Sequence, residues 1–180
     1  MDMSSSPTVP IPVDLAEISA TLVSFPQALA ALLTPVDPSA LAERPAPGEW
    51  CVLEVIGHLI ATDSGAFRDR IKAIMAGEPE ISQFDPWDAI NNRDFTVDSV
   101  ESLVDELASQ RQTSAELIQD LDQSDLQRSA RYGDYGEFAV GDFVHEWPFH
   151  DQDHLKQIVD NLKPYYLRAM TPVMRDALSG

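Results

Sequence analysis

The chain has 180 residues, which is enough for one domain with a substantial core. Its 12 basic and 30 acidic side chains give a net charge of −18, which would repel nucleic-acid phosphates and anionic lipid headgroups. The single cysteine excludes an internal disulfide and is consistent with a reducing compartment. We therefore expect neither nucleic acid nor a membrane as a partner.

Residues 1–12 are rich in serine and proline and predict a flexible arm. They have neither the basic nor the apolar region of a secretory signal, and the longest apolar run, 28–33, is too short to span a bilayer. These features predict a cytoplasmic protein. From about residue 13 to 33, apolar residues recur at steps of three and four, which predicts an amphipathic helix kinked at Pro26. A proline-rich connection with a single helical turn near 40–43 should follow.

A second helix is expected from about 48–50 to Ala76, where Gly77 ends it. Its first half is apolar in nearly every direction, which predicts a helix that is buried all round. Cys51 precedes two apolar residues there, so we expect a small buried core residue and not a nucleophile.

One polar stripe interrupts this apolar helix, because Glu54, His58 and Thr62 follow one another at steps of four. A buried histidine and a buried glutamate both need partners. Three roles remain open for Glu54: it could orient His58, act as a catalytic base, or cap the start of the helix.

The segment 77–95 has no clear periodicity, and nearly 20 residues is long for a connection within a bundle. It is either a crossover between helices or a lid over a substrate. Its aromatic residues Phe84, Trp87 and Phe95 could close over a substrate or pack against the end of the bundle. A third helix should run from about 97 to 121.

Residues 122–137 are polar and rich in turn signals. A fourth helix is expected over about 139–161, kinked at Pro148 and ended at 163–164. A last amphipathic segment follows over 165–178. No stretch alternates with the period of a strand for long enough to predict a sheet.

Three of the four histidines lie in the fourth helix. His150 and His154 are one turn apart on the face of the large apolar residues, whereas His145 points away from it. Two such imidazoles can bind one metal ion, but two core histidines bonded to neighbours would show the same spacing. If the second and fourth helices are neighbours, His58 completes a set of three, the ligand number of a catalytic zinc site with one open position.

The pattern as a whole predicts an all-α fold, a four-helix bundle with a long crossover connection and an additional C-terminal helical segment. The expected division is an arm at 1–12, the bundle at 13–162 and the helical segment at 163–180. Apolar residues of that segment would still need burial once the bundle is complete, which predicts a homodimer. They are Tyr165, Tyr166, Met170, Val173 and Met174.

An ordered set of short motifs resembles the DinB/YfiT-like superfamily over about residues 15–162. The set comprises Trp50 with Glu54, Gly57-His58-Leu59, a turn with Gly136 and Val140, and the pair His150 and His154 followed by Gln157 and Ile158. The resemblance implies a four-helix bundle with one long crossover, a divalent metal ion held by His58, His150 and His154, and frequent dimers. His145 matches no ligand position of the family.

Some members of that superfamily are metal-dependent transferases or isomerases that use a low-molecular-weight thiol. Other members have no assigned activity. The mechanism that fits the chemistry is activation by a divalent metal ion, zinc or nickel, of a thiol cosubstrate or a water that attacks a small-molecule substrate, giving thiol transfer or hydrolysis. Glu54 is the candidate catalytic residue, and Asp151 or Gln157 could support the ligand histidines. Two alternatives stay open, a non-catalytic metal-binding or stress-response bundle and an interaction scaffold without a metal.

Overall fold

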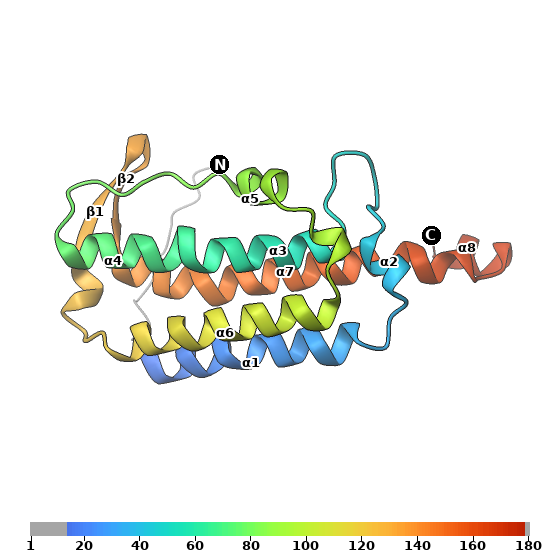
Figure 1. Ribbon diagram of the computed structural model, residues 1–180, viewed down its shortest axis with the longest axis horizontal. Helices are drawn as coiled ribbons and strands as arrows, with labels where there is room; N and C mark the ends of the chain where they lie inside the picture. The colour runs from blue at the N-terminus through green and yellow to red at the C-terminus, as the bar shows by residue number, and fades with distance from the viewer. Residues whose placement is uncertain (1–13, 179–180) are drawn as a thin grey trace, which may run out of the picture.

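A computed structural model describes residues 14–178, and within them four long helical rods form a bundle (Figure 1). The first rod is α1 (Leu15–Leu33) and the third is α6 (Val100–Gln119). The second consists of α3 (Val52–Thr62), a π-helical segment η1 (Asp63–Arg68) and α4 (Asp69–Ala76) without a break. The fourth is α7 (Val140–Arg168). The predicted all-α fold class is confirmed, while the arm expected at 1–12 lies outside the described residues.

The connections contain short elements. Single helical turns or short helices occur as α2 (Pro38–Ala42), α5 (Pro86–Asn92), η2 (Phe95–Val97), η3 (Asp125–Gln127), η4 (Gly133–Tyr135) and α8 (Pro172–Leu178). Strands β1 (Ser129–Tyr132) and β2 (Gly136–Ala139) pair antiparallel, with Ser129 opposite Ala139. The expectation of no sheet was wrong at this hairpin, because strands of four residues are too short to show a clear alternation.

The order of the rods confirms the long crossover. α1 and α7 run in one direction, and the α3 to α4 rod and α6 run in the other (Figure 1). The connection after α4 therefore returns along the bundle to the end where α3 began, and it carries α5 on the way. α1 and α3 each pack against both α6 and α7. As a result α3 and α7 are neighbours, which is the condition for their histidines to meet.

Local signals explain where the helices begin and end. The carboxylate of Asp14 accepts hydrogen bonds from the backbone of Ala16 and Glu17, and Ser99 caps α6 in the same way. Gly77 ends α4 in the left-handed conformation, with φ of 83°, as the sequence predicted. The second rod begins at Val52, later than expected, because the preceding loop remains extended up to its N-cap residue.

The fourth helix is longer than expected. α7 contains both Pro148 and Pro164 and continues to Arg168, so the predicted end at 163–164 was wrong. A proline removes one backbone hydrogen bond, which tertiary contacts can offset. The last turn has such a contact, because the guanidinium of Arg168 pairs with Glu43 beyond α2.

α1 is long and apolar enough to cross a membrane by length and composition, a test that core helices of soluble proteins also pass. In the bundle its buried residues include Leu22, Phe25, Leu29 and Leu33, and it packs along α6. We therefore describe α1 as a core helix of the bundle.

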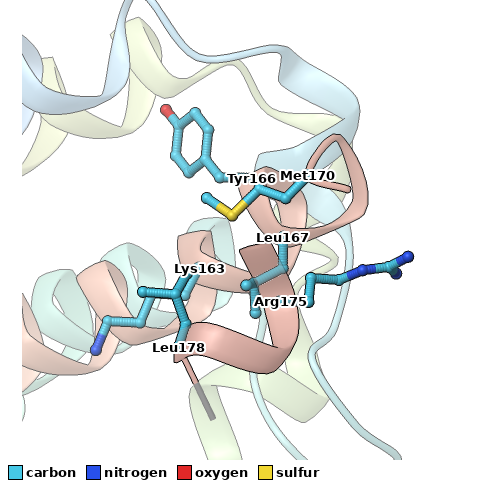
Figure 2. Close-up of a pocket in the computed structure, with 6 residues that line it drawn as sticks. All are labelled: Lys163, Tyr166, Leu167, Met170, Arg175 and Leu178. Atoms are coloured by element: carbon cyan, nitrogen blue, oxygen red, sulfur yellow. The ribbon is translucent and has the colours of Figure 1, made fainter. Parts of the chain in front are cut away.

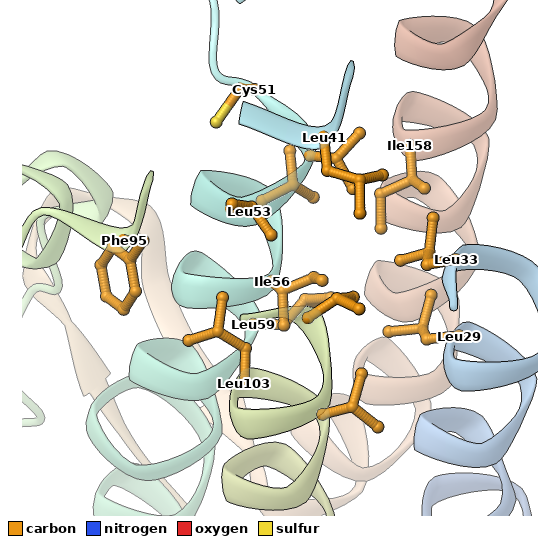
Figure 3. Close-up of a cluster of buried hydrophobic side chains, with 14 of the residues drawn as sticks. Leu29, Leu33, Leu41, Cys51, Leu53, Ile56, Leu59, Phe95, Leu103 and Ile158 are labelled. Atoms are coloured by element: carbon orange, nitrogen blue, oxygen red, sulfur yellow. The ribbon is translucent and has the colours of Figure 1, made fainter. Parts of the chain in front are cut away.

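The core around the first half of α3 joins all four rods. Figure 3 shows Leu29, Ile56, Leu103 and Ile158 among its buried side chains, one from each rod. Cys51 lies in the same cluster and is buried, as predicted.

Two glycines let the crossover connection approach the second rod closely. A Cβ atom at Gly57 would lie 2.6 Å from the ring of Phe95, and one at Gly65 would lie 3.0 Å from the ring of Phe84. Both aromatic rings therefore pack against the bundle. For Phe84 and Phe95 this favours a packing role over closure on a substrate. Trp87 differs from them, since 45% of it is exposed.

Candidate metal centre

The three predicted histidines converge between α3 and α7. The Nε2 atom of His150 lies 3.2 Å from Nε2 of His58 and 3.2 Å from Nε2 of His154. One ring nitrogen of each residue can be chosen so that all three lie within 4.8 Å of one another. This geometry meets the expectation that α3 supplies the third imidazole to the pair on α7.

Burial keeps these imidazoles in the neutral form. It is the main cause that lowers the pKa of His58 to about 3, and the neighbouring His154 adds to the effect. Burial likewise lowers the pKa of His150 to about 3, with smaller contributions from the other two histidines and Arg111. The pKa of His154 is lowered by the same cause. Neutral imidazole is the form that binds a metal ion.

The three imidazole nitrogens are arranged as ligands for a metal cation. In a neutral ring each nitrogen either donates or accepts, so Nε2 of His150 has one proton or one lone pair and cannot form good hydrogen bonds with both neighbours. When each ring carries its proton at Nδ1, three lone pairs face one another, and a shared divalent ion satisfies all of them. Imidazole suits zinc, nickel, copper and iron, whereas calcium and magnesium prefer oxygen ligands.

Gln157 orients one of the three rings. The Nδ1 atom of His154 lies 2.8 Å from Oε1 of Gln157, one turn further along α7, so the ring can donate its Nδ1 proton to that oxygen. This contact directs the Nε2 lone pair of His154 toward the other two histidines. Gln157 was one of two candidates for such a partner, and the structure places it in contact.

Aromatic side chains surround the other two rings. The ring centroid of Trp50 lies 4.8 Å from that of His58, and the ring of Phe67 lies 5.4 Å from that of His150. Phe67 in turn stacks on Trp147 at 4.6 Å. Sequence reasoning missed these contacts, although the position of Trp50 two turns before His58 was a usable signal. These apolar neighbours contribute to the burial that lowers the pKa values of the histidines.

A buried ion network lies next to the histidines, and sequence reasoning did not find it. Arg111 on α6 pairs with Asp151 at 2.5 Å and with Asp63 at 3.2 Å, and all three side chains are almost fully buried. Ser114 donates a hydrogen bond of 2.6 Å to Asp63, and Arg68 lies 3.7 Å from it. Asp151 was the second candidate partner for the histidines, but it bonds to Arg111 instead.

Glu54, the candidate catalytic residue, is engaged at the start of α3. Its carboxylate accepts hydrogen bonds from the backbone N–H of Cys51 at 2.8 Å and from Nε of Arg44 at 2.9 Å. These contacts correspond to the capping role, one of the three that the sequence left open. His145 is exposed, and its Nδ1 lies 2.8 Å from the carbonyl oxygen of Gly141, away from the other histidines.

Replacing Gln157 by leucine should weaken metal binding by about 10- to 100-fold, because loss of an outer partner of a ligand histidine has that effect in comparable sites. The expected result is a weaker zinc affinity in a competition titration with a chromophoric chelator. Lys156→Met is the matched control, since Lys156 is exposed and pairs with Asp160. Equal zinc affinities for the wild-type protein and Gln157→Leu would show that this contact does not position His154.

A four-helix bundle whose facing helices bring three neutral imidazoles together belongs to the class of helical proteins with a candidate metal centre in the core. The comparisons with known proteins then identify the family. The sequence model of the DinB superfamily matches residues 21–158, and the chain belongs to this superfamily.

Two relatives illustrate the likeness. A protein of Oceanobacillus iheyensis, whose name gives the provisional assignment metal-dependent hydrolase, is 25% identical over 118 residues, which are 64% of this chain and 67% of that protein. The solved structure of YfiT from Bacillus subtilis superimposes with a TM-score of 0.77 at 16% identity, covering 89% of this chain and 93% of YfiT. YfiT is described as a probable metal-dependent hydrolase with an unusual four-helix bundle topology. At this identity the likeness to YfiT concerns the fold.

Proposed function

We propose that this protein is a metal-dependent enzyme that binds one divalent ion through His58, His150 and His154 and acts on a small-molecule substrate. The observation that carries the proposal is the convergence of three neutral imidazoles from two helices. Three protein ligands leave a coordination position open, as in catalytic zinc sites. Zinc or nickel matches this donor set.

The ion supplies Lewis-acid activation of a water or a thiol when it is bound. The protein contributes the rest: His154 is oriented by Gln157, and the rings of Trp50 and Phe67 keep bulk water away from the histidines. Among the described residues 14–178 no carboxylate joins the three histidines, and with this ligand set the ion would keep its full double charge. We assign Glu54 a supporting part at the start of α3 and do not require it as a base.

Hydrolysis is the reaction class we place first, and the descriptions of YfiT and the Oceanobacillus protein support it. Thiol transfer is the second candidate, because zinc favours sulfur and a thiol is more acidic than water. The protein itself offers no reactive thiol, since Cys51 is buried and burial raises the pKa of its thiol to about 11. A thiol nucleophile would have to be an external cosubstrate.

A screen of metal-free and metal-loaded protein tests this proposal. Samples reconstituted with zinc or nickel should hydrolyse members of a panel of small esters and amides, or should conjugate glutathione, mycothiol, bacillithiol or coenzyme A to an electrophile. The metal-free protein should show neither reaction. If the metal is bound but the loaded protein reacts no faster than the metal-free protein in any of these assays, the non-catalytic alternative is favoured.

We also propose that the protein is a cytoplasmic homodimer. Apolar side chains of the C-terminal region are exposed on the single chain, among them Tyr166, Val173, Met174 and Leu178. A pocket of about 490 Å³ lies between the end of α7 and α8. Tyr166, Leu167 and Met170 are among its lining residues (Figure 2). A partner protomer would cover this apolar surface.

Sedimentation at micromolar concentration should therefore give a species of twice the 19.9 kDa chain mass. Val173→Asp should shift it toward the monomer, because a charge would be buried in the interface. Val97→Asp is the matched control, since both valines are 79% exposed and Val97 lies in η2. A wild-type protein that sediments only as a monomer would contradict this part of the proposal.

A further inference from the structure

A second cavity lies directly beside the candidate metal centre. It measures about 450 Å³ and is lined by residues of the loop before α3, of α5 and of α7. They are Gly48, Glu49, Trp50, Trp87, Gln157 and Asn161. Two of them also touch the histidines, because Trp50 packs on His58 and Gln157 bonds to His154. The cavity therefore shares a wall with the centre, which is where the remote part of a substrate would lie.

Two indole rings form a corner of this cavity. The centroids of Trp50 and Trp87 are 4.9 Å apart, and the ring planes meet at 64°. Both residues are fixed through their backbone: Asn161 donates a hydrogen bond of 2.9 Å to the carbonyl of Trp50, and Asp85 accepts one of 2.8 Å from the N–H of Trp87. The Trp87 side chain is 45% exposed and does not pack against a glycine of the second rod as Phe84 and Phe95 do.

The charged side chain that lines the cavity is negative. Glu49 supplies a carboxylate, and none of the lining residues in the described part of the chain is a lysine or an arginine. The whole chain carries a net charge of −18. The two indoles meet edge to face, and an ammonium group over the exposed face of such a ring is attracted by its quadrupole, to which a carboxylate in the same lining adds. The carboxylate disfavours an anion in this cavity.

We propose that this cavity binds a cationic ammonium group of the substrate, with Trp50 and Trp87 as the aromatic walls and Glu49 as the counter-charge. As a statement about a substrate, it rests on the proposed function. A substrate anchored in this way would place the reactive bond or electrophilic carbon next to its ammonium group near the three histidines, on the other side of Trp50. The substrate class is therefore an amine-bearing or quaternary-ammonium compound.

Choline and 3,3-dimethyl-1-butanol provide the test, since they have nearly the same shape and only choline is charged. Each is titrated into metal-free protein, and binding is followed by saturation-transfer NMR on the methyl signal of the ligand. Choline should bind, and the neutral alcohol should bind at least about fivefold more weakly, in line with the strength of cation–π contacts. Equal binding of the two compounds would overturn the proposal.

Variants locate the binding site. Trp87→Leu should weaken choline binding by about five- to thirtyfold. Glu49→Gln removes an exposed carboxylate and should weaken it by up to about fivefold. Tyr135→Leu is the control for loss of an exposed aromatic ring, because Tyr135 is 79% exposed and does not line the cavity. Choline binding that survives Trp87→Leu unchanged would place the cation elsewhere and overturn the assignment.

A parallel zinc titration separates this inference from the proposed function. Protein that binds zinc at the histidines but does not bind choline contradicts the cationic substrate and leaves the metal centre intact. Protein that binds choline but not zinc supports the ammonium site and contradicts the metal-dependent enzyme.

Discussion

Replacing His150 by alanine should release the metal ion and abolish activity. His150 is the central ligand of the three, because its Nε2 atom contacts both His58 and His154 at 3.2 Å. Two imidazoles would remain, and the affinity should fall by more than about 100-fold, since loss of a mere outer partner already costs 10- to 100-fold. Metal content after gel filtration and zinc titration measure this effect.

His145→Ala is the matched control on the same helix. Its ring is exposed and lies against the carbonyl of Gly141, so metal content and activity should not change. Circular dichroism should show that both variants remain helical. If His145→Ala and His150→Ala lose the metal to the same extent, the assignment of the ligand face of α7 is wrong.

The largest loss of stability should follow from Arg111→Met. Methionine removes the cation from between Asp63 and Asp151 and leaves two carboxylates buried without their partner. Breaking a buried ion pair from one side typically costs about 3–5 kcal/mol in the free energy of unfolding. Burial already raises the pKa of Asp151 to about 6 despite the opposing effect of Arg111, which shows how strongly this site disfavours a carboxylate charge. Urea unfolding measures the loss.

Arg93→Met provides a closely matched comparison. Arg93 also pairs with two carboxylates, Asp98 and Glu106, but its side chain is 40% exposed. Ion pairs at the surface contribute about 0–1 kcal/mol, so this variant should unfold nearly like the wild-type protein. A loss for Arg111→Met that is no larger than that for Arg93→Met would contradict the structural importance of the buried network.

The histidine cluster could be predicted because all but one of the steps depended on local regularity. His150 and His154 share a helix face through their spacing, and His58 lies in a helix so apolar that it had to be buried. The remaining step, that the two helices are neighbours, came from the family resemblance and is now confirmed by the packing of α3 on α7. Gly77 ended its helix for the reason that the sequence showed.

The features that escaped prediction depend on contacts between distant residues. Arg111 could be recognised as a cation among acidic neighbours, but its partners Asp63 and Asp151 lie 48 and 40 positions away in the chain. Pro164 signals a helix end by its own chemistry, and tertiary contacts overrode that signal in α7. The π-helical segment η1, which contains Asp63, likewise has no pattern in a single sequence.

X-ray absorption at the zinc edge of the reconstituted protein tests the metal centre most directly. We expect one zinc ion per chain with nitrogen ligands at about 2.0–2.1 Å and the outer-shell scattering of three imidazole rings. In the His150→Ala variant, any zinc that remains should show no more than two rings. A wild-type spectrum dominated by oxygen or sulfur ligands, or one without three imidazoles, would contradict the assignment of His58, His150 and His154.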